Sequence, residues 1–173
     1  MSTQRASQGQ PGGRGWDALG LAARHHQRGI DAFDEALVEW FGINRTDGRC
    51  LDVLQEMGPL TAGELARATG LTTGAVTTVV DRMERAGLAR RARDPHDRRK
   101  VIVMLTPEAE AALAELFVPL VREVQSALDD LTEEQIAVVV RFLEVDRQAH
   151  ERHADVLRRT RAERAAGTTA EAG

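Results

Sequence analysis

Two neighbouring stretches of the chain carry side chains that suit contacts with a polyanion. The first has threonines and one glycine, namely Thr72, Thr73, Gly74, Thr77 and Thr78. The second has four cations, and the acid Asp97 lies among them; the cations are Arg93, Arg98, Arg99 and Lys100. Hydroxyls hydrogen-bond to phosphates and base edges, threonine methyls contact thymine methyls, and planar guanidinium groups enter narrow minor grooves. These residue types indicate contacts with double-stranded DNA.

A helix-turn-helix pattern positions the threonines. Thr61 and Glu64 have the spacing of a capping box, which predicts a short helix from residue 61 to about residue 69. Gly70 supplies the turn. A second helix begins near residue 72 and ends at Gly87, with its apolar side chains at helical spacing, namely Val76, Val79, Val80 and Met83. We therefore expect the opposite face to point away from the core, with Thr73, Gly74, Thr77, Thr78 and Arg82 on it.

A hairpin is expected to position the cations. Residues 88–93 and 101–105 flank a charged tip, and the second run, VIVML, is rich in β-branched residues. We expect Asp97 to pair with an arginine of the tip and fix its shape, while Arg99 enters a groove of the DNA. Hairpin and helices together predict a winged helix-turn-helix domain over residues 44–106.

Further helices flank this domain. Residues 16–43 predict one long helix, and residues 107–164 predict two more, the second opened by the capping box of Thr132 and Gln135. Their apolar stripes exceed what a small winged domain covers, so we expect them to pair with a second copy. The expected fold is mainly α, with a small β-hairpin wing between dimerisation helices. A homodimer would bind a pseudo-palindromic operator with half-sites about 10 base pairs apart.

The remaining composition limits the class of protein. Residues 1–15 and 165–173 lack apolar periodicity and are expected to be disordered tails. The 173 residues include a single cysteine, which excludes an intramolecular disulfide and suits a reducing compartment. No apolar run resembles a secretory signal or a membrane span, so a cytoplasmic protein without membrane contact is expected. We predict no enzyme, cofactor or metal site, because no P-loop, GxSxG or HExxH motif occurs.

Charge is unevenly distributed along the chain. The formal net charge of −4 argues by itself against binding nucleic acid. However, residues 81–100 hold eight basic and four acidic side chains, a local charge of +4, whereas residues 107–157 sum to −8. A basic hairpin on an acidic body attracts phosphates to one side of the molecule.

The helix and the hairpin resemble the MarR family of bacterial winged-helix regulators. The resemblance lies in LTTGAVTTVVDRMERAGL (residues 71–88) and in DPHDRRKVIVMLT (residues 94–106), and the helical layout extends it to about residues 16–160. It implies a homodimeric transcription regulator, in most cases a repressor. The helix from residue 72 would enter the major groove, with Asp97 and Arg99 as the acid and the arginine of the wing. It also implies release by a small aromatic or lipophilic effector.

Two features leave the effector open. Phe33, Trp40, Gly48 and Cys50 are candidates to line a pocket, although core packing is the preferred explanation of the positions of Phe33, Trp40 and Cys50. Gly48 stands where relatives often carry a bulky residue, so we expect either a cavity beside Cys50 or a weakened helix.

Three alternatives compete with this interpretation. Cys50 could act as a redox sensor, although its place in an apolar stripe predicts a buried, inert thiol. Histidine pairs at residues 25–26 and at residues 150 and 153 could bind a metal ion, although they lack further ligands. A winged helix that binds only protein would have an apolar outer face instead of a polar one.

Overall fold

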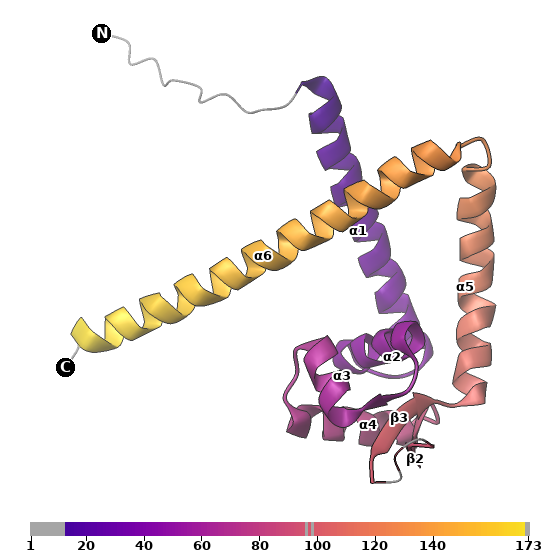
Figure 1. Cartoon of the computed structure of the whole chain (residues 1–173), viewed down its shortest axis with the longest axis vertical. Coiled ribbons are helices and arrows are strands. Elements are labelled where there is room, and N and C mark those ends of the chain that lie inside the picture. Colours follow the sequence, from indigo (N-terminus) through magenta and orange to yellow (C-terminus); the bar gives the residue numbers. More distant parts are fainter. Residues whose placement is uncertain (1–12, 96, 98, 172–173) are drawn as a thin grey trace. The chain divides into compact units, whose positions relative to one another are not determined.

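The computed structural model describes residues 13–95, residue 97 and residues 99–171 (Figure 1). For residues 14 and 165–171 only the backbone is described. The chain divides into two units, residues 1–117 and residues 118–173.

The described elements confirm a mainly helical fold with a small β-hairpin. In chain order they are α1 (Arg14–Trp40), α2 (Arg45–Met57), β1 (Leu60–Thr61), α3 (Ala62–Thr69), α4 (Thr73–Arg85), β2 (Ala89–Arg93), β3 (Val101–Leu105), α5 (Pro107–Ala127) and α6 (Glu133–Glu171). The helix-turn-helix is α3 and α4, and the hairpin is β2 and β3.

Side-chain caps set where the helices begin. Asn44 accepts hydrogen bonds from the first turn of α2, and the Asp47 carboxylate accepts one from the Asn44 backbone, which completes a capping box. Thr61 and Glu64 form the predicted box at α3. Thr72 caps α4 through its hydroxyl, which accepts from the Ala75 backbone at 3.2 Å. These caps satisfy amides that the helices leave free, so the helix starts follow from local sequence.

The sheet has one strand more than the sequence indicates. Its order is β1-β3-β2, and both pairings are antiparallel. Leu60 pairs with Val103, and Thr61 pairs with Ile102. Two residues are too few to give an alternating pattern, so β1 has no periodic signature. The strand joins the start of α3 to the hairpin.

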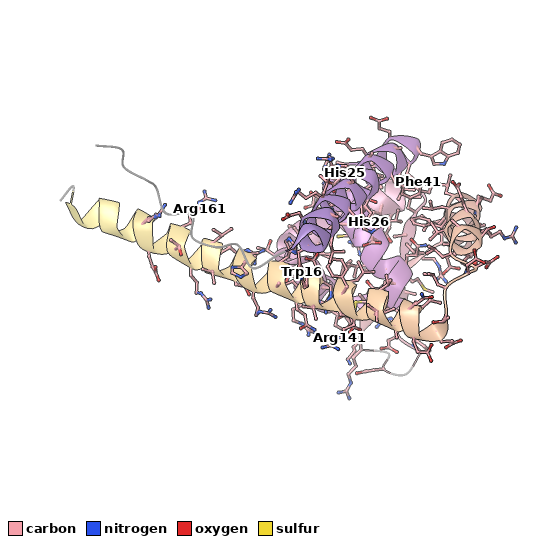
Figure 2. The ribbon with its side chains drawn as sticks, turned by 90° about the horizontal axis from the view of Figure 1, so that it is seen from above. Trp16, His25, His26, Phe41, Arg141 and Arg161 are labelled. Atoms are coloured by element: carbon pink, nitrogen blue, oxygen red, sulfur yellow. The ribbon has the colours of Figure 1, made fainter. Side chains whose placement is uncertain are left out.

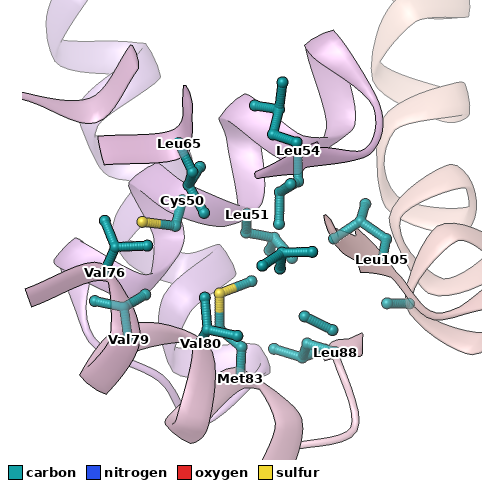
Figure 3. Packing of buried hydrophobic residues seen from close by; sticks show 14 of the residues in the cluster. Cys50, Leu51, Leu54, Leu65, Val76, Val79, Val80, Met83, Leu88 and Leu105 are labelled. Atoms are coloured by element: carbon teal, nitrogen blue, oxygen red, sulfur yellow. The ribbon is translucent and has the colours of Figure 1, made fainter. Parts of the chain in front are cut away.

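The core of the first unit lies between α2, α3, α4 and the sheet (Figure 3). Met83, Val76 and Leu65 are fully buried there, and Leu51 is 1% exposed. The predicted inner face of α4 is confirmed, because Val76, Val79, Val80 and Met83 are all buried. From α5, Ala109 and Leu113 join this core. Phe117 packs edge-to-face on Phe33 of α1, with ring centres 5.1 Å apart.

Of the two expectations for Gly48, a cavity or a weakened helix, the first meets a steric obstacle. A Cβ built on Gly48 would lie 2.6 Å from Cγ1 of Val38, so the Val38 side chain of α1 occupies the space. Gly48 therefore serves the close approach of α1 to α2.

The second unit consists of the end of α5 and all of α6. Helix α6 continues to Glu171, into the stretch of residues 165–173 that was expected to be a disordered tail. At the other end α1 begins at residue 14, and residues 1–12 of the expected N-terminal tail lie outside the described part of the chain. Within residues 13–95, 97 and 99–171, no helix combines the length and the apolarity that a membrane span needs.

Candidate nucleic-acid interface

The outer face of α4 is polar and has little bulk. Thr73, Gly74, Thr77 and Thr78 are all exposed, opposite the buried valines. Nothing lies within 4 Å of a Cβ built on Gly74, so the surface is open there. A helix with such a face can approach the floor of a major groove closely.

The threonine hydroxyls of this face are already engaged as donors. Thr77 donates to the Thr73 carbonyl at 3.1 Å, and Thr78 donates to the Gly74 carbonyl at 3.3 Å. A hydroxyl has one proton and two lone pairs, so each oxygen is left as an acceptor. In this geometry Thr77 and Thr78 can accept from the amino group of a base, but they have no proton to give to a phosphate.

Arg82 does not stand free on the outer face, contrary to the sequence-based expectation. Its guanidinium turns to Asp47 of α2, with Nε 3.0 Å from Oδ2 and Nη2 2.5 Å from Oδ1. The Asp47 side chain is 2% exposed, whereas that of Arg82 is 32% exposed. The hydrogen bond with Asp47 raises the pKa of Arg82 further above its usual range. Arg82 therefore joins α4 to α2.

Asp47 is a functional candidate that the sequence reasoning missed. The Asn44-x-x-Asp47 spacing is a capping-box signal, which predicts its place in the first turn of α2. Its pairing with a residue 35 positions later leaves no local trace in the sequence.

A second missed residue, Arg91 of β2, bridges the wing and α4. Its Nη2 lies 2.8 Å from Asp81 Oδ1, and its Nη1 pairs with Glu84. The Arg91 backbone N–H also donates to Glu84 Oε1 at 2.8 Å. The two acidic residues lie three apart on α4, as a helix face requires, which was the available signal.

The tip of the hairpin is closed by backbone hydrogen bonds. Lys100 N–H donates to the Asp97 carbonyl at 2.9 Å, and Asp94 N–H donates to the Lys100 carbonyl at 3.1 Å. The Asp97 carboxylate accepts from the backbone N–H of Arg99 at 3.1 Å. Asp97 thus shapes the loop as expected, but its described side-chain contact is with an arginine's backbone and not with a guanidinium.

The described cations of the hairpin lie on its surface. Arg93, Arg99 and Lys100 are exposed, and Arg93 also interacts within the protein. Arg98, the remaining residue of the predicted wing contact, lies outside the described residues, as does residue 96. Arg99 and Lys100 therefore lie at the tip of the hairpin, directly before the start of β3.

The four candidate pocket residues have different environments. Trp40 is 72% exposed, whereas Cys50 is fully buried. Phe33 packs edge-to-face on Phe117, and the space at Gly48 is filled by Val38. A ligand pocket at these four residues stays a prediction.

Cys50 and the histidines were the alternatives for sensing. Burial raises the pKa of the Cys50 thiol to about 11, which disfavours the reactive thiolate. His25 and His26 are exposed on α1 (Figure 2). In the part of the chain that the structure describes, no three His, Cys, Asp or Glu side chains gather as metal ligands.

Comparisons with known proteins agree with this geometry. The model of the MarR family matches residues 41–100. YcgE of Bacillus subtilis (strain 168), an uncharacterized HTH-type transcriptional regulator, is 39% identical over 111 residues, which cover 64% of this chain and 72% of YcgE. The HTH-type transcriptional repressor NicR of Pseudomonas putida (strain KT2440) is 38% identical over 74 residues, or 43% of this chain and 46% of NicR.

A solved structure extends the likeness beyond the matched segment. A MarR family protein from Bacillus stearothermophilus superimposes with a TM-score of 0.57 at 28% identity, covering 79% of this chain and 96% of that one. Sequence match, helix-turn-helix and hairpin coincide on the same residues. The chain belongs to the MarR family of winged helix-turn-helix transcriptional regulators.

Proposed function

We propose that the protein is a homodimeric repressor that binds a pseudo-palindromic duplex operator and is released by a small aromatic or lipophilic molecule. In the complex α4 lies in the major groove, and Arg99 with Lys100 contacts the adjacent minor groove or its phosphates. The observation that carries the proposal is the outer face of α4. It is polar, open at Gly74, and followed along the chain by a hairpin with exposed cations.

Exposed apolar side chains support the dimer. On α5 the chain exposes Val118, Leu120, Val121 and Val124, and on α6 it exposes Ile136, Val139, Val140 and Leu143. A monomer would leave the exposed half of each of these side chains in water, and covering it gains about 25 cal/mol per Å² of apolar surface. A second copy of the chain covers such faces symmetrically and brings two α4 helices to two half-sites. The repressor assignment is supported by the likeness to NicR.

The experiment that tests DNA binding compares two arginine variants on the upstream region of the protein's own gene. Arg99→Ala should weaken binding by about 1–3 kcal/mol and lower the salt slope by about 0.9 for a lost phosphate contact. Arg141→Ala, which removes an exposed arginine of α6, is the matched control and should leave affinity unchanged. Equal affinity for Arg99→Ala and wild type, or a flat salt response of the wild type, would contradict the proposal.

The dimer and the effector need their own measurements. Sedimentation should give twice the mass of 18.9 kDa, and a monomer at micromolar concentration would contradict the dimer. A panel of small phenols should include a compound that lowers operator affinity by about 5- to 150-fold, the usual range of coupling between two sites. The same compound should relieve repression in transcription from the bound promoter, whereas lower transcription on its addition would indicate an activator.

A further inference from the structure

We infer that Arg91 is a positioning residue for DNA binding, which couples the wing to α4 and does not itself contact DNA. This inference rests on the proposed function. It concerns a cation in the middle of the basic segment, where charge alone would suggest a phosphate contact.

Both terminal nitrogens of the Arg91 guanidinium contact α4. Nη1 pairs with the Glu84 carboxylate, and Nη2 lies 2.8 Å from Asp81 Oδ1. Nη2 also lies 3.4 Å from the carbonyl oxygen of Thr77. One arginine thus contacts three residues on successive turns of α4, and its side chain is 32% exposed.

The backbone at Arg91 strengthens the same link. The Arg91 N–H donates to Glu84 Oε1, so Glu84 bonds to both the main chain and the side chain of one β2 residue. In the sheet Arg91 pairs with Val103 of β3, which is buried. The position of the hairpin along α4 is therefore set at Arg91, in addition to the packing of the core.

Charge balance argues against a direct DNA contact. Two carboxylates, those of Asp81 and Glu84, face one guanidinium, so this cluster carries no positive charge to attract phosphates. Arg91 instead offsets part of the negative charge of two acidic groups on the helix that the proposed function places in the groove. Without Arg91, both carboxylates would repel the backbone of the DNA.

Positioning and charge have different signatures in a double-mutant cycle with Arg99. If Arg91 holds the wing in place, then Arg99 makes its contact well only when Arg91 is present, and the two substitutions are non-additive. If Arg91 acts only through charge or general stability, its loss adds to that of Arg99. Arg90→Ala is the matched control, because Arg90 is the exposed neighbour on the same strand.

The experiment measures operator affinity for wild type, R91A, R99A and R91A/R99A, with R90A and R90A/R99A in parallel. In the wild-type background, we expect R99A to lower operator affinity by about 5- to 150-fold. In the R91A background, we expect the fold-loss of operator affinity caused by R99A to be smaller by at least about twofold. In the R90A background, we expect the same fold-loss as in wild type. Chemical footprints should report the same effect, with minor-groove protection by the wing reduced more than major-groove protection of guanine N7.

Should R91A fold poorly, D81N/E84Q takes its place, because it removes both negative charges that pair with Arg91 and keeps the arginine. The role of Arg91 would be overturned if the losses of operator affinity from R91A and R99A were additive, as they are expected to be for R90A and R99A. It would also be overturned if the footprints weakened equally in both grooves. Either result would leave the proposed function intact. If wild type binds no operator and R99A has no effect, both the proposed function and this role fail.

Discussion

The guanidinium of Arg82 on α4 donates two hydrogen bonds to the carboxylate of Asp47 on α2, from Nε to Oδ2 at 3.0 Å and from Nη2 to Oδ1 at 2.5 Å. Two parallel N–H···O bonds of this kind fix geometry as well as charge. Since the Asp47 side chain is 2% exposed and that of Arg82 is 32% exposed, only the arginine has access to water.

This asymmetry predicts unequal effects of the two alanine substitutions. Arg82→Ala leaves a carboxylate in the core without its cation, so it should lower the free energy of unfolding more than Asp47→Ala does. Removing the unpaired Asp47 carboxylate as well should raise the free energy of unfolding again, by roughly 1–3 kcal/mol in the double variant relative to Arg82→Ala. Urea unfolding measures all three. An Arg82→Ala variant as stable as Asp47→Ala would show that water reaches Asp47.

The close approach at Gly48 gives a second prediction, because two effects of Gly48→Ala oppose one another. Alanine favours a helix by about 1 kcal/mol over glycine, whereas an overpacked site costs about 1–3 kcal/mol. With a Cβ 2.6 Å from a stiff valine, crowding should win and destabilise the protein.

Removing the obstacle should reverse the sign of this effect. In a Val38→Ala background, Gly48→Ala should raise the melting temperature relative to Val38→Ala alone. The control is Gly63→Ala on α3, which has open space within 4 Å and should be neutral or stabilising in both backgrounds. A stabilising Gly48→Ala in the wild type would contradict the steric account.

Cys50 should be chemically silent in the folded protein. Burial raises its thiol pKa to about 11, so thiol reagents and peroxide should react with Cys50 only after unfolding, and peroxide should leave operator affinity unchanged. Between pH 9.0, the ordinary pKa of the thiol, and about pH 11, the folded thiol keeps its proton, whereas the unfolded thiol loses it. Stability should therefore fall with rising pH across this interval.

The Cys50→Ala variant should lack this part of the pH dependence and otherwise behave as wild type. Fast labelling of native Cys50 near neutral pH would restore the redox alternative.

The hydroxyl geometry of α4 predicts what kind of contact Thr77 makes. Its proton is given to the Thr73 carbonyl, so we expect contact with a base amino group or a thymine methyl and not with a phosphate. Thr77→Val should leave the salt slope of binding unchanged and alter base preference at one operator position. Thr78→Val should behave in the same way at its own position. A shallower salt slope, with equal weakening on all sequences, would assign Thr77 to a phosphate instead.

The sequence predicts those parts of the fold that local signals determine. The capping boxes at Asn44 and Thr61 and the apolar stripe of α4 lie within a few residues, so helix starts and the buried face follow from them. The hairpin likewise follows from VIVML and the charged tip.

Contacts between distant segments are where the predictions failed. Nothing near Arg82 indicates a buried carboxylate 35 residues earlier, so its side chain was expected on the outside. The space beside Gly48 depends on Val38 of another helix, and β1 is defined only by its partner strand. Each failure concerns a side chain or strand whose environment comes from a different element.

Strand β1 has a consequence for local opening. Thr61 pairs with Ile102 of the wing strand, and its hydroxyl also caps α3 by accepting from Glu64 N–H. If β3 separates from β1, the first turn of α3 loses the residue that holds its cap in place. In hydrogen-exchange terms, we expect the wing strand and the start of the helix-turn-helix to open and close together. Events at the hairpin thus extend to the helix that supports α4.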